Sequence, residues 1–304
     1  MIGRSPLFPT RRYGRRLKWR GQDEWGVVEL VEGELGLELH FGSSALQGRI
    51  NLAQPWRPIA EYAVSMAALA ALPDPQSRRD ESLPNRPAIC LLGLGTGSLA
   101  WTYHRLIPHG ELTAIELRPA VIEVAIKRLG LSQLKGLKLY QGDAADQLAQ
   151  LNDRSQTLIA IDLFTSEGMA PCLDSSRFWR EVSRVLHPCG AVAINTWSGD
   201  QRAFDTLSSK VRSLLCPTGD MLIIDHEGFG NCIVLASPRA LNREGTLLRA
   251  DRIDRALSDA TPQIRPRCKG WRGQRRGWAE AAKDAGLSGE SVKGRLSRAW
   301  EASR

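Results

Sequence analysis

The hydrophobic pattern from residue 88 to residue 237 alternates between short apolar runs and segments with apolar residues at helical spacing. The runs predict strands at 88–92, 111–116, 137–141, 157–162, 190–197, 221–226 and 231–237. The segments between them predict helices at about 98–106, 119–129, 144–151, 175–187 and 201–215. Such alternation implies a mostly parallel sheet with helices on both faces. The short connection between the last two strands predicts an antiparallel hairpin.

A glycine turn follows the first predicted strand, with Gly93, Gly95 and Gly97 in a G-x-G-x-G pattern. Glycine allows the backbone N–H groups to come close to a ligand at the start of the next helix. The dinucleotide-binding pattern would need a glycine at 98, where this chain has Ser98. The turn resembles instead the first motif of the class I AdoMet-dependent transferases. A turn that binds no ligand is the alternative interpretation.

Acidic residues stand at the ends of the next three predicted strands. Ligands of open α/β sheets bind beyond the carboxyl ends of the strands. Glu116 is placed to accept hydrogen bonds from both ribose hydroxyls, and Asp143, before Ala144, from an adenine amino group. A helix N-cap role is the rival interpretation for Asp143. Asp162 closes the fourth strand.

The order of these segments resembles the spermidine synthase family. The matching segments are the glycine turn, Glu116-Leu-Arg-Pro-Ala-Val-Ile-Glu-Val, Gly142-Asp-Ala, Asp162 before a small loop, Phe178-Trp-Arg-Glu-Val and Leu186-His-Pro-Cys-Gly. Upstream, Ser44-Ala-Leu-Gln47-Gly-Arg-Ile and Ala60-Glu61-Tyr62 resemble the family's amino-terminal segment. The likeness spans about 27–237.

The resemblance implies a class I AdoMet-transferase (Rossmann-like) α/β sheet with a terminal antiparallel hairpin and a small N-terminal β segment before it. The residues that follow predict a helical basic tail after the sheet. The expected division is a disordered basic arm at 1–26, the β segment and a covering helix at 27–80, the AdoMet-binding domain at 81–240, a basic linker at 241–276 and a helix-turn-helix-like tail at 277–304.

The family resemblance also implies a reaction, in which an aminopropyl group moves from decarboxylated AdoMet to an amine without a metal. Asp162 stands at the family's position for the base that accepts the amine proton, with Tyr62 as its supporting hydroxyl. Methyl transfer from AdoMet on the same fold is the main alternative. The expected donor-binding residues are Gln47, Gly93, Gly95, Thr96, Gly97, Glu116, Asp143 and Ala144. The expected acceptor-binding residues are Glu61, Thr165 and Glu167.

Two departures from the family pattern concern the substrates. Thr96 replaces the acid that in the family faces the ammonium of the aminopropyl donor, which favours a donor that retains its carboxylate. Thr165 replaces an acid that in the family faces the acceptor amine, and Glu167 could substitute for it. The sequence therefore leaves the donor and the acceptor open.

Charge is divided unevenly along the 304 residues. The net charge is +8, but residues 1–20 and 262–304 together contribute +14, so the part between them carries −6. Basic ends suit polyanions. The segment from Gly277 resembles small helix-turn-helix modules of some homing endonucleases, so the tail predicts either nucleic-acid binding or packing on the body or a second subunit, as in a homodimer. A nucleic-acid-binding protein that retains the fold as a scaffold is thus another function to consider.

Six scattered cysteines show no zinc-ligand spacing and are expected to be reduced. The longest uncharged run contains the glycine turn, and the first 20 residues have no apolar core, so neither a membrane span nor a secretory signal is expected. These features predict a cytoplasmic enzyme without a metal.

Overall fold

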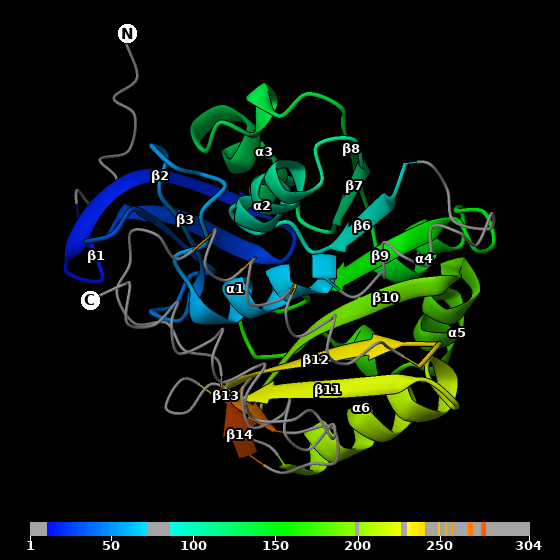
Figure 1. Cartoon of the computed structure of the whole chain (residues 1–304). Coiled ribbons are helices and arrows are strands. Elements are labelled where there is room, and N and C mark those ends of the chain that lie inside the picture. The colour runs from blue at the N-terminus through cyan, green and yellow to red at the C-terminus, as the bar shows by residue number, and fades with distance from the viewer. Residues whose placement is uncertain are drawn as a thin grey trace, which may run out of the picture.

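The computed structural model describes residues 11–71, 86–197, 201–225, 230–240, 249, 253, 257, 267–269 and 275–277. Two sheets form its framework (Figure 1). The larger has nine strands in the order β14-β13-β11-β12-β10-β9-β6-β7-β8, and the smaller has five in the order β1-β2-β3-β4-β5. The predicted fold class of an α/β sheet preceded by a small β segment is confirmed.

The parallel part of the large sheet has β6 (Ala88–Leu92) at its centre. It pairs on one side with β7 (Glu111–Glu116), which pairs in turn with β8 (Leu137–Gln141), and on the other side with β9 (Gln156–Ile161), followed by β10 (Leu186–Trp197). Strand β12 (Asn231–Ser237) runs antiparallel to β10 and to β11 (Asp220–Asp225). The predicted antiparallel hairpin is therefore present.

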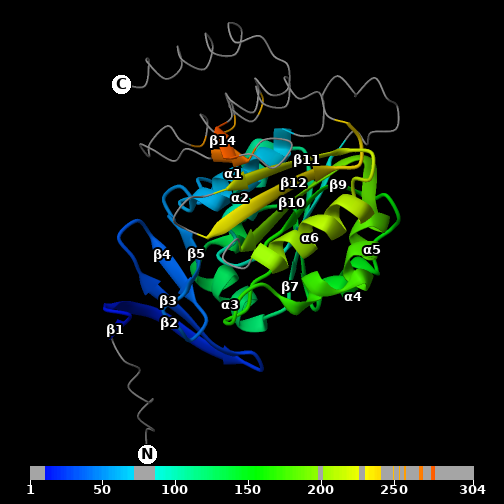
Figure 2. The same cartoon turned by 90° about the horizontal axis from the view of Figure 1, so that it is seen from below.

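Helices cover both faces of the large sheet, as Figure 2 shows. One apolar cluster joins a sheet face to α1 (Glu61–Ala67), the 3₁₀ turn η1 (Ala68–Ala71) and α2 (Ser98–Leu106). The other face packs on α4 (Ala144–Leu148), α5 (Ser176–Val185) and α6 (Gln201–Leu214). Both faces of the central strands β6 and β9 are buried, so these strands are mostly apolar, whereas the edge strand β8 is partly exposed.

The third apolar cluster attaches the small sheet to α3 (Pro119–Arg128), which lies between the two sheets in Figure 2. Short turns η3 (Leu131–Gln133) and η4 (Pro171–Asp174) complete the connections. The small sheet consists of β1 (Arg11–Arg12), β2 (Arg15–Asp23), β3 (Gly26–Glu32), β4 (Leu37–His40) and β5 (Leu46–Ile50). Strand β5 is the element through which this sheet reaches the glycine turn.

The prediction of a disordered arm at 1–26 is wrong for residues 11–26, which form β1, β2 and the start of β3. Pairing of charges accounts for the difference. The Glu29 carboxylate is fully buried and lies 2.8 Å from the Arg12 Nε and 3.4 Å from the Arg20 Nε. Lys18 pairs with Glu32 at 2.9 Å. Acids on neighbouring strands thus neutralise a segment that looks unpaired in the sequence.

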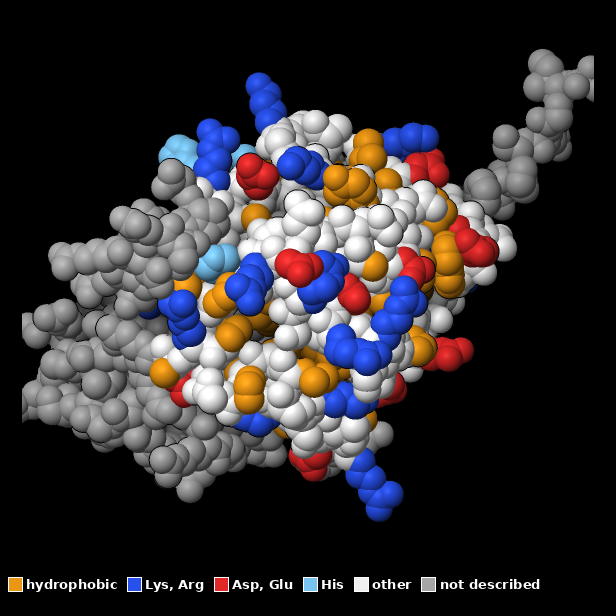
Figure 3. Space-filling model, turned by 90° about the vertical axis from the view of Figure 1, so that its right-hand side faces the viewer, with side chains coloured by type: hydrophobic (Ala, Val, Ile, Leu, Met, Phe, Trp, Pro, Cys, Tyr) orange, Lys and Arg blue, Asp and Glu red, His pale blue; other side chains and the backbone are white. Residues whose placement is uncertain are grey.

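Two short strands, β13 (Arg267–Lys269) and β14 (Arg275–Gly277), extend the sheet from β11. They lie within the predicted basic linker except for Gly277, the first residue of the predicted tail. The predicted helix-turn-helix tail lies almost wholly outside the described residues. Figure 3 shows acidic and basic side chains interspersed on one face of the body, so the net negative charge of the central region is not gathered there into a patch of one sign.

A buried ion pair links the small sheet to α3. The Arg118 Nη2 lies 2.7 Å from Asp23 Oδ1 and also donates to the Gly26 carbonyl at 2.8 Å. The Arg118 guanidinium carbon lies 4.4 Å from the centre of the Phe41 ring. The Asp23 side chain is 4% exposed and that of Arg118 is 8% exposed, so neither charge is well solvated.

We predict that Asp23→Ala lowers the free energy of unfolding by about 3 kcal/mol, because it leaves the buried Arg118 charge without its partner. Urea denaturation measures the change. The matched control is Glu123→Ala, which removes an exposed pair with Lys127 and should cost less than about 0.5 kcal/mol. Equal losses in the two variants would contradict the assignment.

Candidate functional site

The glycine turn brings the end of β6 against the end of β9. Gly93 has φ +90°, and a Cβ at this position would lie 2.1 Å from the Asp162 carbonyl oxygen. Only glycine fits such a backbone-to-backbone approach. Gly95 and Gly97 also have positive φ, and Gly97 is the N-cap of α2 with no side-chain cap. The three predicted glycines therefore form a tight turn at the carboxyl end of β6, directly before α2.

Glu116 at the end of β7 is buried and braced by the backbone. One carboxylate oxygen accepts the Leu94 N–H at 2.9 Å, and the other accepts the Arg118 N–H at 2.9 Å. Burial raises the pKa of Glu116, and these backbone hydrogen bonds oppose the rise. The Gly95 amide also bonds this carboxylate. A carboxylate has about four acceptor positions, so one position remains to accept from a ribose hydroxyl. That role stays a prediction.

Asp143 is the N-cap of α4, the rival interpretation of this residue. Its Oδ1 accepts the backbone N–H of Ala145 at 2.8 Å and of Asp146 at 3.2 Å. Ala144 is the buried first residue of this helix. The Oδ2 of Asp143 makes no hydrogen bond with the described residues, so the cap does not use the whole carboxylate. Contact with an adenine is a prediction that the capping neither requires nor prevents.

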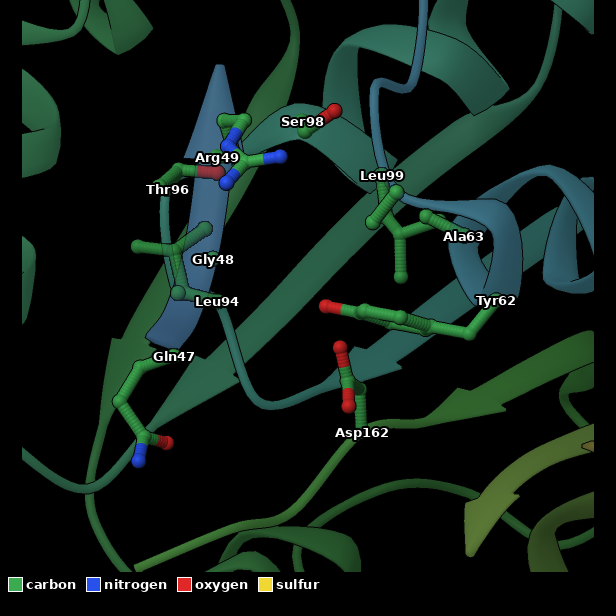
Figure 4. A pocket seen from close by; sticks show the side chains of 12 residues that line it. Gln47, Gly48, Arg49, Tyr62, Ala63, Leu94, Thr96, Ser98, Leu99 and Asp162 are labelled. Atoms are coloured by element: carbon green, nitrogen blue, oxygen red, sulfur yellow. The ribbon is translucent and has the colours of Figure 1, made fainter. Parts of the chain in front are cut away.

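A cavity opens beside the glycine turn, between the two sheets (Figure 4). Its described lining comes from β5, the start of α1, the glycine turn and the end of β9. The lining residues are Gln47, Gly48, Arg49, Ala60, Tyr62, Ala63, Leu94, Gly95, Thr96, Ser98, Leu99 and Asp162. The cavity thus brings together five of the predicted site residues, from segments more than 100 positions apart.

Asp162 and Tyr62 lie together at one end of this cavity (Figure 4). The Tyr62 hydroxyl is hydrogen-bonded to the Asp162 carboxylate. Asn195 Nδ2 donates to Asp162 Oδ1 at 2.8 Å, and Asn231 Nδ2 donates to Asn195 Oδ1 at 3.0 Å. Burial raises the pKa of Asp162 from 3.8 to about 6, although the bonds from Asn195 and Tyr62 oppose the rise. The carboxyl is therefore a stronger base than an exposed aspartate and is still mostly ionised at neutral pH.

The loop after β9 holds Thr165 and Glu167, the predicted acceptor-binding residues. The Thr165 hydroxyl donates to the Gly168 carbonyl at 3.3 Å and accepts the Glu167 N–H at 3.1 Å, so it is engaged within the loop. Glu167 is exposed. Gln47 Nε2 donates to the Thr165 carbonyl at 3.5 Å, which links β5 to this loop. Glu61 is the first residue of α1 and is not among the lining residues.

Three further polar residues lie in this region and were not predicted from the sequence, namely Arg49, Ser98 and Asn195. Each had a recognisable signal. Arg49 stands two positions after Gln47, so both side chains lie on the same face of a strand. Ser98 directly follows the glycine pattern. Asn195 lies near the carboxyl end of β10, an apolar strand that pairs with β9, and so lies close to the sheet edge where ligands bind.

The described part of the chain contains no group of three or more His, Cys, Asp or Glu side chains placed to hold a metal ion. Nor does any described helix combine the length and apolar character needed to cross a membrane.

Comparison with known proteins places the chain among transferases. The methyltransferase domain family matches residues 88–231. The polyamine aminopropyltransferase of Neisseria meningitidis serogroup A is 27% identical over 240 residues, which cover 78% of this chain and 85% of that protein. The human eEF1A lysine and N-terminal methyltransferase is 26% identical over 160 residues, covering 49% of this chain but only 22% of that protein.

Solved structures with the same fold include both kinds of enzyme. A probable spermidine synthase from Corynebacterium glutamicum has a TM-score of 0.67 at 17% identity, with 88% of this chain and 93% of that chain covered. Human methyltransferase-like protein 13, solved in complex with SAH, has a TM-score of 0.55 at 24% identity, with 67% and 94% covered. The sheet, the N-terminal strands and these relatives together identify the chain as a spermidine synthase-like member of the class I methyltransferase fold.

Proposed function

We propose that this protein alkylates a small amine, using a sulfonium nucleoside of the AdoMet type as donor and Asp162 as the base. The observation that carries the proposal is the half-buried, hydrogen-bonded Asp162–Tyr62 pair at the end of β9, in a cavity that also includes the glycine turn. A carboxylate with a pKa of about 6 can accept a proton at neutral pH.

The residues along the sheet edge support binding of the donor nucleoside. The glycine turn leads into α2, and the Leu94 N–H in this turn donates to the Glu116 carboxylate. The carboxylate at the end of β7 therefore lies beside the turn. Glu116 would accept from a ribose hydroxyl, and Asp143 would accept from the adenine through its uncommitted oxygen. These groups would hold the nucleoside while leaving its sulfonium near the cavity.

The reaction needs a neutral amine and a reachable carbon on the sulfonium. The nitrogen lone pair forms a bond to that carbon, the carbon–sulfur bond breaks, and its electron pair stays on sulfur, which leaves as a neutral thioether. A free alkylamine with a pKa near 10.4 is almost wholly protonated at about pH 7. Asp162 would take the proton that the amine must lose, while the hydroxyl of Tyr62 orients the carboxylate.

The group transferred depends on the donor. The aminopropyltransferase relative, which aligns over most of both chains, supports transfer of an aminopropyl group from decarboxylated AdoMet. The methyltransferase relatives support methyl transfer from AdoMet as the second candidate. Both reactions need the same nucleoside contacts and the same base.

We predict that Asp162→Asn lowers the rate of the transfer reaction by about a hundredfold or more, because the variant has no base for the amine proton. Release of 5′-methylthioadenosine or S-adenosylhomocysteine reports either transfer reaction. Asp153→Asn, which changes a surface aspartate paired with Arg184, is the matched control and should keep full activity. Retained activity in Asp162→Asn would show that another group is the base.

The same substitution should stabilise the fold at neutral pH. The folded-state pKa of Asp162 is raised from 3.8 to about 6, so its contribution is most favourable below the lower value and is lost as the pH rises through the higher one. We expect Asp162→Asn to raise the free energy of unfolding by up to about 3 kcal/mol near pH 7.5 and by less near pH 5. Thermal unfolding at both pH values measures this, and a loss of stability at the higher pH would contradict the pKa assignment.

Asn195 provides a further test, because its hydrogen bond lowers the pKa of Asp162. Asn195→Leu removes this bond, so the acidic limb of the pH–rate profile should move upward by about one pH unit. The profile of kcat/KM measures the shift. A uniform loss of rate with an unchanged profile would mean that Asn195 supports the fold rather than the ionisation of Asp162.

A further inference from the structure

The cavity has charged residues of opposite sign at its two ends. Among its described lining residues, Asp162 is the sole acid and Arg49 the sole cation. Figure 4 shows Arg49 with Thr96 and Ser98 on the side away from the Asp162–Tyr62 pair. These three side chains can all donate hydrogen bonds, and no acid is among the described lining residues at this end.

Arg49 is held in place by a buried acid and keeps part of its guanidinium free. Its Nε and Nη2 donate to the Oε1 of Glu38 at 2.9 and 2.7 Å. The Glu38 side chain is 1% exposed and also pairs with Arg15. One carboxylate therefore faces two guanidinium groups, which leaves a net positive charge beside the cavity. The Nη1 of Arg49 makes no hydrogen bond within the described part of the chain.

Strand β5 holds this guanidinium close to the glycine turn. A Cβ on Gly48 would lie 3.1 Å from the Thr96 Cγ2, and a Cβ on Gly95 would lie 3.8 Å from the Gln47 carbonyl oxygen. The residues before Arg49 thus contact the turn that is expected to hold the donor. The packing of β5 against the turn therefore fixes the position of Arg49.

The hydroxyl groups at the start of α2 also lack partners among the described residues. Ser98 is 8% exposed, and its buried Oγ makes no hydrogen bond within the described part of the chain. Thr96, which is 4% exposed, makes no side-chain hydrogen bond with the described residues. The N-cap Gly97 supplies no side chain to cap the first amides of the helix. Unsatisfied donors of this kind at a helix N-terminus favour an anion, and burial without a partner is costly.

We propose that Arg49, Ser98, Thr96 and the first amides of α2 form a subsite for the carboxylate of the donor's amino-acid tail, so that the donor is AdoMet itself. This inference rests on the proposed function and specifies its donor. The tail ammonium is present in both AdoMet and decarboxylated AdoMet, so only the carboxylate distinguishes them. The transferred group is then the methyl group, and the neutral thioether that leaves is S-adenosylhomocysteine.

Calorimetry with AdoMet, decarboxylated AdoMet and 5′-methylthioadenosine tests the subsite. The last compound has the nucleoside but no amino-acid tail, and so reports the nucleoside contacts alone. The full chain should bind AdoMet about tenfold to a hundredfold more tightly than decarboxylated AdoMet, as expected for a charged hydrogen-bonded contact. Arg49→Gln should abolish this preference without lowering the affinity for 5′-methylthioadenosine.

Two further variants keep the test decisive. Ser98→Ala removes one hydrogen-bond donor without disturbing Glu38. This variant should bind AdoMet several-fold more weakly and bind the other two compounds as before. It tests the subsite even if Arg49→Gln fails to fold. Arg177→Gln removes a surface cation paired with Asp146 and should change nothing.

The outcomes separate the inference from the proposed function. Equal or tighter binding of decarboxylated AdoMet by the full chain overturns the carboxylate subsite but leaves amine alkylation standing. Failure to bind any of the three compounds overturns the proposed function itself. Tight binding of AdoMet that is unchanged in both Arg49→Gln and Ser98→Ala overturns the assignment of these residues.

Discussion

The approach of the β6 and β9 backbones at Gly93 is the constraint on which the site depends. Hydrogen bonds continue across the strand ends, from Asp162 N–H to the Leu92 carbonyl at 2.8 Å and from Gly93 N–H to the Ile115 carbonyl at 2.9 Å. The chain can turn there only because residue 93 has no Cβ. The glycine turn, Glu116 and Asp162 therefore meet at one edge, although each comes from a different segment of the sequence.

The two carboxylates at this edge illustrate how local bonding divides their properties. Both are desolvated, which raises the pKa of each. For Glu116, hydrogen bonds from backbone amides oppose this rise in pKa. These amides cannot titrate, and their position is set by the turns. Within the described part of the chain, the Asp162 carboxylate is hydrogen-bonded by the side chains of Tyr62 and Asn195, and its pKa is also raised by the charge of Glu116. The same residue chemistry thus supplies a structural acceptor in one strand and a basic group in its neighbour.

The sequence predicted the strands, the helices and the residues at the strand ends, because parallel strands bring their carboxyl ends to one edge whatever their loops do. Features that depend on how strands and loops pair were missed. Lys18 and Arg20 of β2 pair with Glu32 and Glu29 of β3, and the sequence pattern did not indicate these pairs. The engagement of the Thr165 hydroxyl and the place of Arg49 depend likewise on the loop conformation and on how the two sheets pack.

The buried pair between Asp23 and Arg118 has a consequence for how such proteins can diversify. The small sheet contributes Gln47 and Arg49 to the cavity, yet it is anchored at α3, through contacts that do not line that cavity. Substitutions at Gln47 and Arg49 can therefore change the side chains that line the cavity without altering the anchor. The attachment of the small sheet and the selectivity for the substrate are thus separable. A lineage can exchange one substrate for another while its nucleoside-binding sheet remains the same.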